Sequence, residues 1–349
     1  MPRLDYDIVM ATRNRPDAVA LSLPLILSQT RLPARIVIVD SSEDPGPIEA
    51  LARKAVENAP CPVDYLQAEA GVTHQRNVGL GRCTSEIVIF PDDDSLLYPD
   101  AAEEMMAVYE ADTEARIAGV CARPMDRPPP ETEGDLESYE AERLTASRSA
   151  LRRVRQRIKE ALGCTNPFLA VGWRLNGQHD APEWLASRDA ATVPYMTGFR
   201  MSFRRTAIAV DGFDETLRKY GWFEDIDVSY TAMRHGLVVM ANRARIYHHR
   251  TAARRDDGYR MGMWAILNRG YVVMKHVRAN PAVFPDPGRE ARRLDLYCRA
   301  RTMAYRLLAR DGYGRDRARG AADGLRQLQM LTRSPSADLA TIYRRLETS

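Results

Sequence analysis

The sequence has few cysteines, no long apolar run and no glycine-rich phosphate loop, and each absence excludes a class of protein. Its five cysteines are scattered, odd in number and without a CxxC pair, which indicates free, mostly buried thiols in a reducing compartment. No run of about 18 apolar residues occurs, so no segment is expected to span a bilayer. Residues 1–7 form no apolar signal segment, so the sequence predicts a cytoplasmic protein whose membrane contact, if any, is peripheral at the inner face.

The charge of the chain is nearly balanced, because 50 Lys and Arg stand against 47 Asp and Glu, a net charge of +3. Such a balance argues against a dedicated nucleic-acid-binding protein. The chain has 349 residues, of which 45% are hydrophobic. That is enough for one large α/β domain with an appendage.

Short apolar runs alternate with helix-compatible segments over the first 122 residues. The runs 8–10, 36–39, 63–66 and 86–90 are expected to be strands, and the segments 17–29, 48–58 and 72–83 are expected to be helices. The β-branched run 36–39 is typical of a parallel strand that is covered on both faces. This alternation predicts a mainly parallel sheet, in which ligands bind beyond the carboxyl ends of the strands.

The remainder of the chain is basic and largely helical in pattern. Four prolines between 124 and 135 predict a loop, and residues 141–162 form a basic amphipathic pattern, either a solvated helix packed on the domain or a membrane-surface helix. Helical spacing dominates from residue 260 onward, and residues 291–349 hold 13 arginines against 6 acids. We expect this tail to dock on the main domain or to form a homo-oligomer, with contact to anionic lipid as the alternative.

The run that ends at Phe90 is followed by Pro91 and by three consecutive aspartates, Asp92, Asp93 and Asp94. Three carboxylates at the exit of a buried strand repel one another, and a divalent cation that gathers them relieves the repulsion. Mg²⁺ and Mn²⁺ prefer oxygen ligands and often take one or two carboxylates together with the phosphates of a substrate. Asp40 follows the run 36–39 at the same expected edge, so the two acidic sites indicate one pocket.

A second acidic pair, Glu224-Asp225, precedes a predicted helix that runs to Arg234. Acids in a first helical turn are stabilised by the free N–H groups there, so ordinary helix charge is one interpretation. The other is a carboxylate base that takes a proton from an incoming hydroxyl. Trp222 and Phe223 would then exclude water and stack on the face of a sugar.

Two further segments carry polar groups to strand ends. His248 and His249 follow a predicted strand at 236–240, where an imidazole could join carboxylates and a diphosphate around a cation; the other histidines, which we treat as non-catalytic, are His74, His179, His235 and His276. The loop 11–16 is polar and carries two arginines, so it could hold a nucleotide base or phosphates. It contains neither GxGxxG nor GxxxxGK[ST].

Taken together, these motifs resemble the family 2 glycosyltransferases, which have the GT-A fold. The matching segments are T-x-N-R-P at 12–16, S-Q-T at 28–30, I-V-I-V-D-S-S-x-D at 36–44, G-V-x-x-x-R-N-x-G-L at 71–80, F-x-D-D-D at 90–94, G-F-D-E at 212–215, E-D-x-D at 224–227 and Y-H at 247–248. Each motif alone is weak, but their order across residues 5–250 is specific.

The resemblance implies inverting transfer of a sugar from a nucleotide diphosphate to an acceptor hydroxyl, with Mn²⁺ or Mg²⁺ as cofactor. It makes Asp225 the base and places the metal on Asp94 and His248, with His249 as the alternative to His248. It also implies that Asp40 accepts from a pyrimidine N–H. The nucleotide contacts that it implies are Ala11, Thr12, Arg13, Asp40, Arg76, Asp92 and Asp93, and the sugar or acceptor contacts are Trp222, Phe223 and Glu224.

One position departs from the family pattern. Arg13 stands where many members have a tyrosine that stacks on the base. A guanidinium can stack too, but the exchange could change which nucleotide fits. The Asp40 contact favours a UDP- or dTDP-sugar donor, and the acceptor is expected to be a glycan or a lipid-linked sugar in glycan or polysaccharide biosynthesis.

We therefore expect a GT-A domain over residues 1–255, with an insert at about 124–165, and a helical extension over 256–349. Two alternatives remain open. A catalytically inactive sugar-nucleotide-binding protein would be expected to lack Asp94 or Asp225, and both are present. A sugar nucleotidyltransferase would carry a loop rich in glycine and bearing a lysine after its first strand, but the loop 11–16 has neither residue.

Overall fold

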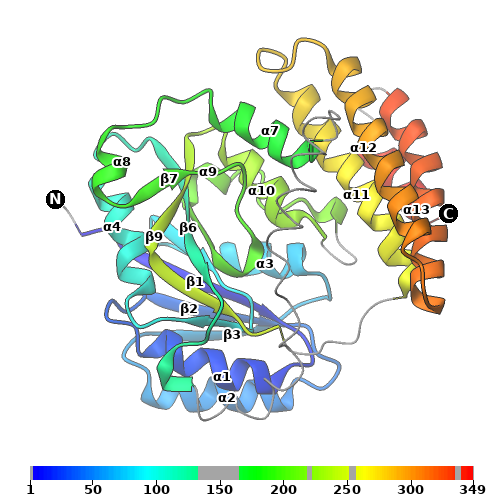
Figure 1. Cartoon of the computed structure of the whole chain (residues 1–349). Helices are drawn as coiled ribbons and strands as arrows, with labels where there is room; N and C mark the ends of the chain where they lie inside the picture. Colours follow the sequence, from blue (N-terminus) through cyan, green and yellow to red (C-terminus); the bar gives the residue numbers. More distant parts are fainter. Residues whose placement is uncertain (1–2, 133–164, 218–221, 251–256, 335–338, 349) are drawn as a thin grey trace. The chain divides into compact units, whose positions relative to one another are not determined.

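A computed structural model describes residues 3–132, 165–217, 222–250, 257–334 and 339–348 (Figure 1). The predicted basic helix at 141–162 lies outside these residues. The chain forms two compact units, whose described parts are 3–132, 175–217 and 222–250 in the first and 165–174, 257–334 and 339–348 in the second. None of the described helices is long and apolar enough to cross a membrane.

The first unit is built on a mixed, mainly parallel nine-stranded sheet. The strands are β1 (Tyr6–Thr12), β2 (Arg35–Asp40), β3 (Val63–Gln67), β4 (Ile87–Phe90), β5 (Ser95–Leu97), β6 (Ile117–Met125), β7 (Ala190–Thr192), β8 (Met201–Arg204) and β9 (Leu237–His248). Their order is β3-β2-β1-β4-β8-β6-β9-β5, and β7 pairs with β9. The pairs β3-β2, β2-β1, β1-β4 and β6-β9 are parallel, whereas β8 runs antiparallel to both β4 and β6.

Helices cover this sheet on both faces, because its strands alternate buried side chains between the faces. The helices of the first unit are α1 (Pro16–Leu27), α2 (Gly46–Asn58), α3 (Val72–Leu80), α4 (Ala101–Ala111), α8 (Trp184–Ser187), α9 (Arg205–Ile208) and α10 (Glu224–Ala232), with single 3₁₀ turns η1 (Pro130–Thr132), η3 (Gly198–Arg200) and η4 (Glu215–Leu217). Ile8, Ile36 and Ile38 pack with α1, α2 and α4 in one core. On the other face α3 lies against β1 and β2, so close at Gly79 that an added Cβ would lie 2.3 Å from Val9. Figure 1 shows α1 and α2 on one side of the sheet and α3 on the other.

The predicted strands and helices of the first 90 residues are confirmed, with small shifts of their ends. The third helix ends at Leu80 instead of residue 83. The strand expected at 236–240 is longer, because β9 continues without interruption to His248. The expected proline-rich loop is also shorter, since β6 extends to Met125.

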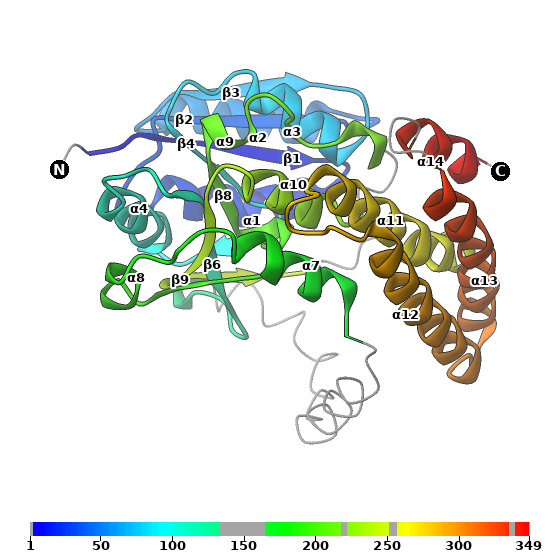
Figure 2. The ribbon, with the colours of Figure 1, turned by 90° about the horizontal axis from the view of Figure 1, so that it is seen from above.

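The second unit is helical, as the spacing after residue 260 predicts. It contains α11 (Gly258–Ala279), α12 (Pro287–Leu307), α13 (Gly312–Arg333) and α14 (Leu339–Thr348), together with residues 167–174 of α7 (Pro167–Asn176). Figure 2 shows α11, α12 and α13 side by side. Glycines allow α11 and α13 to approach closely, since a Cβ at Gly262 would lie 2.0 Å from the Arg317 carbonyl oxygen.

Candidate functional site

The carboxyl ends of β1, β2 and β4 meet at one edge of the sheet, and they bring the predicted polar residues together. Thr12 stands opposite Asp40 in the parallel register, and Ala11 forms a bridge with Asp92. Gln75 of α3 fixes this edge, because its side-chain amide donates to the Thr12 carbonyl at 2.8 Å and to the Val39 carbonyl at 2.9 Å. The prediction of one acidic edge is therefore confirmed.

Arg15 clamps two of the three aspartates. Its Nη1 lies 2.5 Å from Asp93 Oδ1 and its Nη2 lies 2.5 Å from Asp94 Oδ2, while Thr12 donates its hydroxyl to Asp93 Oδ2 at 2.9 Å. Both carboxylates are buried. A guanidinium presents two parallel donors, so it neutralises and orients both groups at once.

Asp94 and His248 meet because β5 pairs antiparallel with β9, and this pairing places Ser95 opposite His248. His248 Nε2 lies 3.1 Å from Asp94 Oδ1. Phe199, in the turn η3, stacks on the His248 ring with centroids 4.5 Å apart and planes inclined by 13°. Ser95 ties that turn to the aspartates, since its hydroxyl accepts from Asp92 N and donates to the Phe199 carbonyl.

These residues fit a divalent cation. Asp92, Asp94 and His248 each offer one ligand atom, and the three atoms lie within 4.8 Å of one another. Asp94 Oδ1 is buried and faces His248 Nε2, and a cation held between these two atoms would satisfy both. Carboxylate oxygens and an imidazole nitrogen suit Mn²⁺ or Mg²⁺. His249 instead donates its backbone N–H to the Asp94 carbonyl.

Burial and neighbouring charges shift the pKa values of Asp93 and Asp94 in opposite directions. Burial raises the pKa of Asp93 to about 7, although the Arg15 guanidinium opposes the shift. Burial also acts to raise the pKa of Asp94, but the His248 imidazole and Arg15 outweigh it and hold that pKa below its usual range. Asp94 thus stays ionised, as a cation ligand must.

Arg76 connects the triple aspartate to the second acidic pair. This side chain is almost fully buried on α3, and it donates to Asp92 Oδ1 at 2.8 Å and to Glu224 Oε1 at 2.9 Å. Gly198 leaves room for it, because a Cβ there would lie 3.2 Å from Arg76 Nη2. The two acidic motifs, more than a hundred residues apart in the chain, therefore line one site.

Asp225 lies in the first turn of α10 and is held by backbone donors. Gly198 N donates to its Oδ2 at 3.1 Å and Ile226 N to its Oδ1 at 2.8 Å. The residue before the acidic pair, Phe223, has a left-handed backbone with φ of 79°, which is rare for a bulky residue and common near functional sites. Burial raises the pKa of Asp225, and burial together with the Asp225 charge raises the pKa of Glu224 to about 8.

The outer predicted residues have other partners in the described structure. Arg13 is exposed and lies 2.6 Å from Glu43. Asp40 is buried, and its oxygens accept from Ser42 and from the Tyr65 hydroxyl. Trp222 and Phe223 stack on each other with centroids 5.1 Å apart. Their contacts with nucleotide, sugar or acceptor stay predictions.

Sequence reasoning missed the residues that support the site. Arg15 and Gly198 were not predicted as site residues, and neither were Ser95 and Phe199. Arg15 lies inside the T-x-N-R-P motif and directly before a helix, which is a signal for a phosphate or carboxylate contact. Nothing in the sequence distinguishes Phe199, because its partner His248 is brought to it only by the pairing of β5 with β9.

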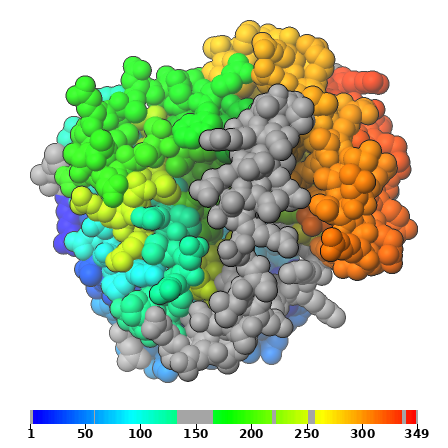
Figure 3. Space-filling view, viewed as in Figure 1, coloured from blue at the N-terminus to red at the C-terminus, as the bar shows by residue number. Residues whose placement is uncertain are grey.

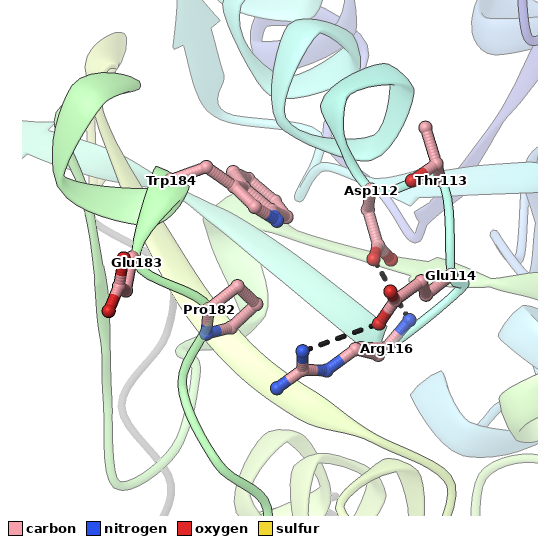
Figure 4. Close-up of a pocket in the computed structure, with 7 residues that line it drawn as sticks. All are labelled: Asp112, Thr113, Glu114, Arg116, Pro182, Glu183 and Trp184. Atoms are coloured by element: carbon pink, nitrogen blue, oxygen red, sulfur yellow. Dashed lines mark hydrogen bonds and ion pairs between the residues drawn. The ribbon is translucent and has the colours of Figure 1, made fainter.

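A separate cavity of about 460 Å³ lies away from this chemistry (Figure 4). It is lined by Asp112, Thr113, Glu114, Arg116, Pro182, Glu183 and Trp184. Residues 112–116 precede β6, which is parallel in direction to β4, so the cavity lies at the amino-terminal edge of the sheet. Its Asp112 carboxylate already accepts from the backbone N–H groups of Arg116 and Ile117.

Part of the chain is similar to known glycosyltransferases. Residues 7–168 match the model of the family described as Glycosyl transferase family 2. The Bacillus subtilis (strain 168) protein YwdF, described as an uncharacterized glycosyltransferase, is 32% identical over 108 residues. That match covers 31% of this chain and only 39% of the relative's length.

Two solved structures share the fold over nearly the whole chain. One is the mannosyltransferase PcManGT from Pyrobaculum calidifontis in complex with GDP-Man and Mn²⁺, with a TM-score of 0.50 and 16% identity over 100% of this chain and 87% of that one. The other is S. aureus TarS 1-349, with a TM-score of 0.50 and 12% identity over 99% of this chain and 91% of that one. The predicted GT-A architecture is thereby confirmed.

Proposed function

We propose that this chain, whose residues 7–168 match the model of glycosyl transferase family 2, is an inverting, metal-dependent glycosyltransferase. It would move a sugar from a nucleotide-diphosphate donor to an acceptor hydroxyl. One observation carries the proposal: Asp94 and His248, far apart in the sequence of the first unit, converge with Asp92 beside a buried arginine that also binds Glu224.

The cation would be held by Asp94 and His248, with Asp92 as a third ligand. When bound, it would neutralise the charge that grows on the leaving diphosphate. Arg15 binds Asp94 Oδ2, which leaves Oδ1 of the same carboxylate directed toward His248. The Phe199 ring stacks on the His248 imidazole and fixes its orientation.

Asp225 is the proposed base. Its carboxylate takes the proton of the acceptor hydroxyl while that oxygen forms a bond to the anomeric carbon. The bond from the anomeric carbon to the diphosphate oxygen breaks on the opposite face of the sugar, so the configuration inverts. The raised pKa of Asp225 suits this role, because a base with a higher pKa accepts the proton more readily.

The donor nucleotide would lie across the ends of β1 and β2, near Ala11, Thr12, Arg13 and Asp40. A pyrimidine N–H directed at Asp40 would have to displace or share one of its present donors, Ser42 or Tyr65. Arg76 orients the Asp92 carboxylate, which would contact the ribose or a water molecule bound to the cation. Trp222 and Phe223 would cover the sugar, and a glycan or lipid-linked hydroxyl would enter beside Glu224.

The decisive experiment measures release of nucleoside diphosphate from UDP-, dTDP- and GDP-sugars with Mn²⁺, in wild type, Asp225→Asn and Asp94→Asn. We expect Asp225→Asn to keep calorimetric nucleotide binding and to lose about two to four decades in rate. Asp94→Asn should lose the Mn²⁺ dependence of binding. The exposed acid Asp211, changed to Asn, is the matched control and should behave as wild type.

Three results would overturn the proposal. If no sugar nucleotide binds, the transferase reading fails. If donors bind without turnover under any acceptor, the chain is an inactive binding protein. If pyrophosphate is formed from a nucleoside triphosphate and a sugar phosphate, it is a nucleotidyltransferase.

A further inference from the structure

One face of α12 exposes large apolar side chains. Leu296, Met303 and Leu307 are 51%, 53% and 78% exposed. Isolated exposed leucines are common in soluble proteins, but three large apolar side chains on one helical face form a patch that calls for a partner. The atoms of this part of the chain, orange in Figure 3, lie at the surface.

A row of arginines runs beside the apolar residues. Arg292, Arg299 and Arg306 are exposed and recur every seven residues, which is close to two helical turns. They therefore line up along the helix next to Leu296 and Met303. We name these six residues (Arg292, Leu296, Arg299, Met303, Arg306 and Leu307) the α12 face.

The opposite side of α12 is already used in packing. Leu294, Cys298 and Thr302 are buried, and the Thr302 hydroxyl donates to the Cys298 carbonyl within the helix. The α12 face is thus not needed for the core of the second unit, and it is open to a partner.

The segment that carries the α12 face is cationic. Between Pro287 and Arg333 the chain has twelve arginines and five acids. Asp295 pairs with Arg299 at 2.6 Å and Asp286 lies 3.6 Å from Arg292, whereas Arg306 has no ion pair among the described residues. This excess of arginines favours an anionic partner.

A groove beside the α12 face adds a place for an anionic head group. It has a volume of about 310 Å³ and lies between α12 and α13, where Arg306, Arg319 and Arg326 line it. Its one acid, Asp323, is engaged by the Tyr259 hydroxyl at 2.7 Å and by Arg326. One guanidinium group can donate two parallel hydrogen bonds to two oxygens of a phosphate, so the groove suits a phosphate.

The combination of charge and apolar area selects one occupant. A second copy of the chain on this face would bring three arginines against three arginines. A soluble polyanion would use the arginines but would leave the leucines in water. A bilayer with anionic phospholipids satisfies both rows, since its phosphates meet the arginines and its acyl boundary receives the apolar side chains. We propose that the α12 face docks the protein on an anionic phospholipid surface.

The test is flotation of the full chain with phosphatidylcholine vesicles that contain or lack phosphatidylglycerol, at low and high salt. We expect binding only with phosphatidylglycerol, and weaker binding at high salt. The triple variant R292Q/R299Q/R306Q should lose at least about tenfold in partitioning, because each arginine near an anionic surface contributes to the affinity. The triple variant L296S/M303S/L307S should lose a similar factor.

Matched controls distinguish the face from total charge and total hydrophobicity. R53Q/R82Q/R243Q removes three exposed arginines from the first unit, and L32S/V56S/V210S removes three exposed apolar side chains there. Both should float as wild type does. Equal loss in the controls, equal binding to phosphatidylcholine alone, or no binding to either vesicle would overturn the proposal. The proposal would also be overturned if light scattering shows a dimer that the L296S/M303S/L307S variant dissociates and the other variants keep.

Sugar-nucleotide turnover is not needed for this measurement. Failure of the vesicle experiment leaves the transferase proposal intact, and an inactive protein that still floats leaves the docking proposal intact.

Discussion

At the scale of single residues, the proposed function makes the adjacent carboxylates Glu224 and Asp225 responsible for the pH dependence of the reaction. Burial raises the pKa of Asp225, and burial together with the Asp225 charge raises the pKa of Glu224 to about 8. The proposed base, Asp225, works only when ionised, so kcat/KM should fall as the pH drops through this raised pKa. We expect the acid limb to lie above the usual aspartate range of about 4.

Glu224→Gln tests the origin of that limb. The variant keeps an oxygen for Arg76 and removes a carboxyl group that is protonated below about pH 8, so a limb that belongs to Asp225 should stay in place. A pH profile with saturating Mn²⁺ measures it. A limb that moves or disappears would assign the titration to Glu224 and would contradict the role given to Asp225.

Phe199 is a positioning residue for the proposed cation site, because its ring stacks on the His248 imidazole. Phe199→Leu should free the imidazole to rotate and raise the Mn²⁺ dissociation constant about tenfold, as the loss of an outer partner of a metal ligand does. Saturating Mn²⁺ should restore most of kcat, and Phe199→Tyr should bind Mn²⁺ as wild type does. A lower Tm with unchanged Mn²⁺ affinity would instead show a purely structural role.

At the scale of elements, the pair α11 and α13 depends on its glycines. A Cβ at Gly262 would lie 2.0 Å from the Arg317 carbonyl oxygen, and a Cβ at Gly320 would lie 1.8 Å from the Tyr259 carbonyl oxygen. Backbone atoms cannot yield as a side chain can, so Gly262→Ala should destabilise the second unit by about 1–3 kcal/mol or more. Denaturant unfolding measures this change.

Gly312 offers the matched control for that substitution. It begins α13, and nothing lies within 4 Å of a Cβ built there. Gly312→Ala should therefore leave the free energy of unfolding unchanged or slightly increased, because alanine restricts the unfolded chain. Equal destabilisation by both variants would contradict the close approach of the two helices.

Elements with a strong local pattern were predictable, and those defined by distant partners were not. The unbroken apolar runs of β2 and β4 predict buried parallel strands. The four residues of β8 give no such signal, yet this strand joins the two parallel parts of the sheet. The second half of β9 was not predicted, because Asn242, Arg243 and Arg245 interrupt its apolar pattern. Such polar residues occur there because that half pairs with β6 and β5 near an edge of the sheet.

At the scale of the whole molecule, the same distinction applies to the site. Asp92, Asp94, Asp225 and His248 lie in motifs whose chemistry is visible in the sequence. The supporting contacts of Arg15, Arg76 and Phe199 arise from segments far apart along the chain, so they emerge only with the topology.

The chain has two compact units, each with its own buried core. We therefore expect two transitions in calorimetric unfolding, since separate cores unfold as separate cooperative units. Gly262→Ala should lower the Tm of one transition and leave the other in place. A single transition that shifts as a whole would show that the units unfold together.

The central claim is that one cation is shared by the acids after β4 and the imidazole at the end of β9. Anomalous diffraction from a crystal grown with Mn²⁺ and a nucleoside diphosphate tests it most directly. The account predicts one manganese peak at coordination distance, roughly 2.0–2.6 Å, from both Asp94 Oδ1 and His248 Nε2. A peak bound elsewhere, or one that touches the diphosphate but neither of these two side chains, would contradict it.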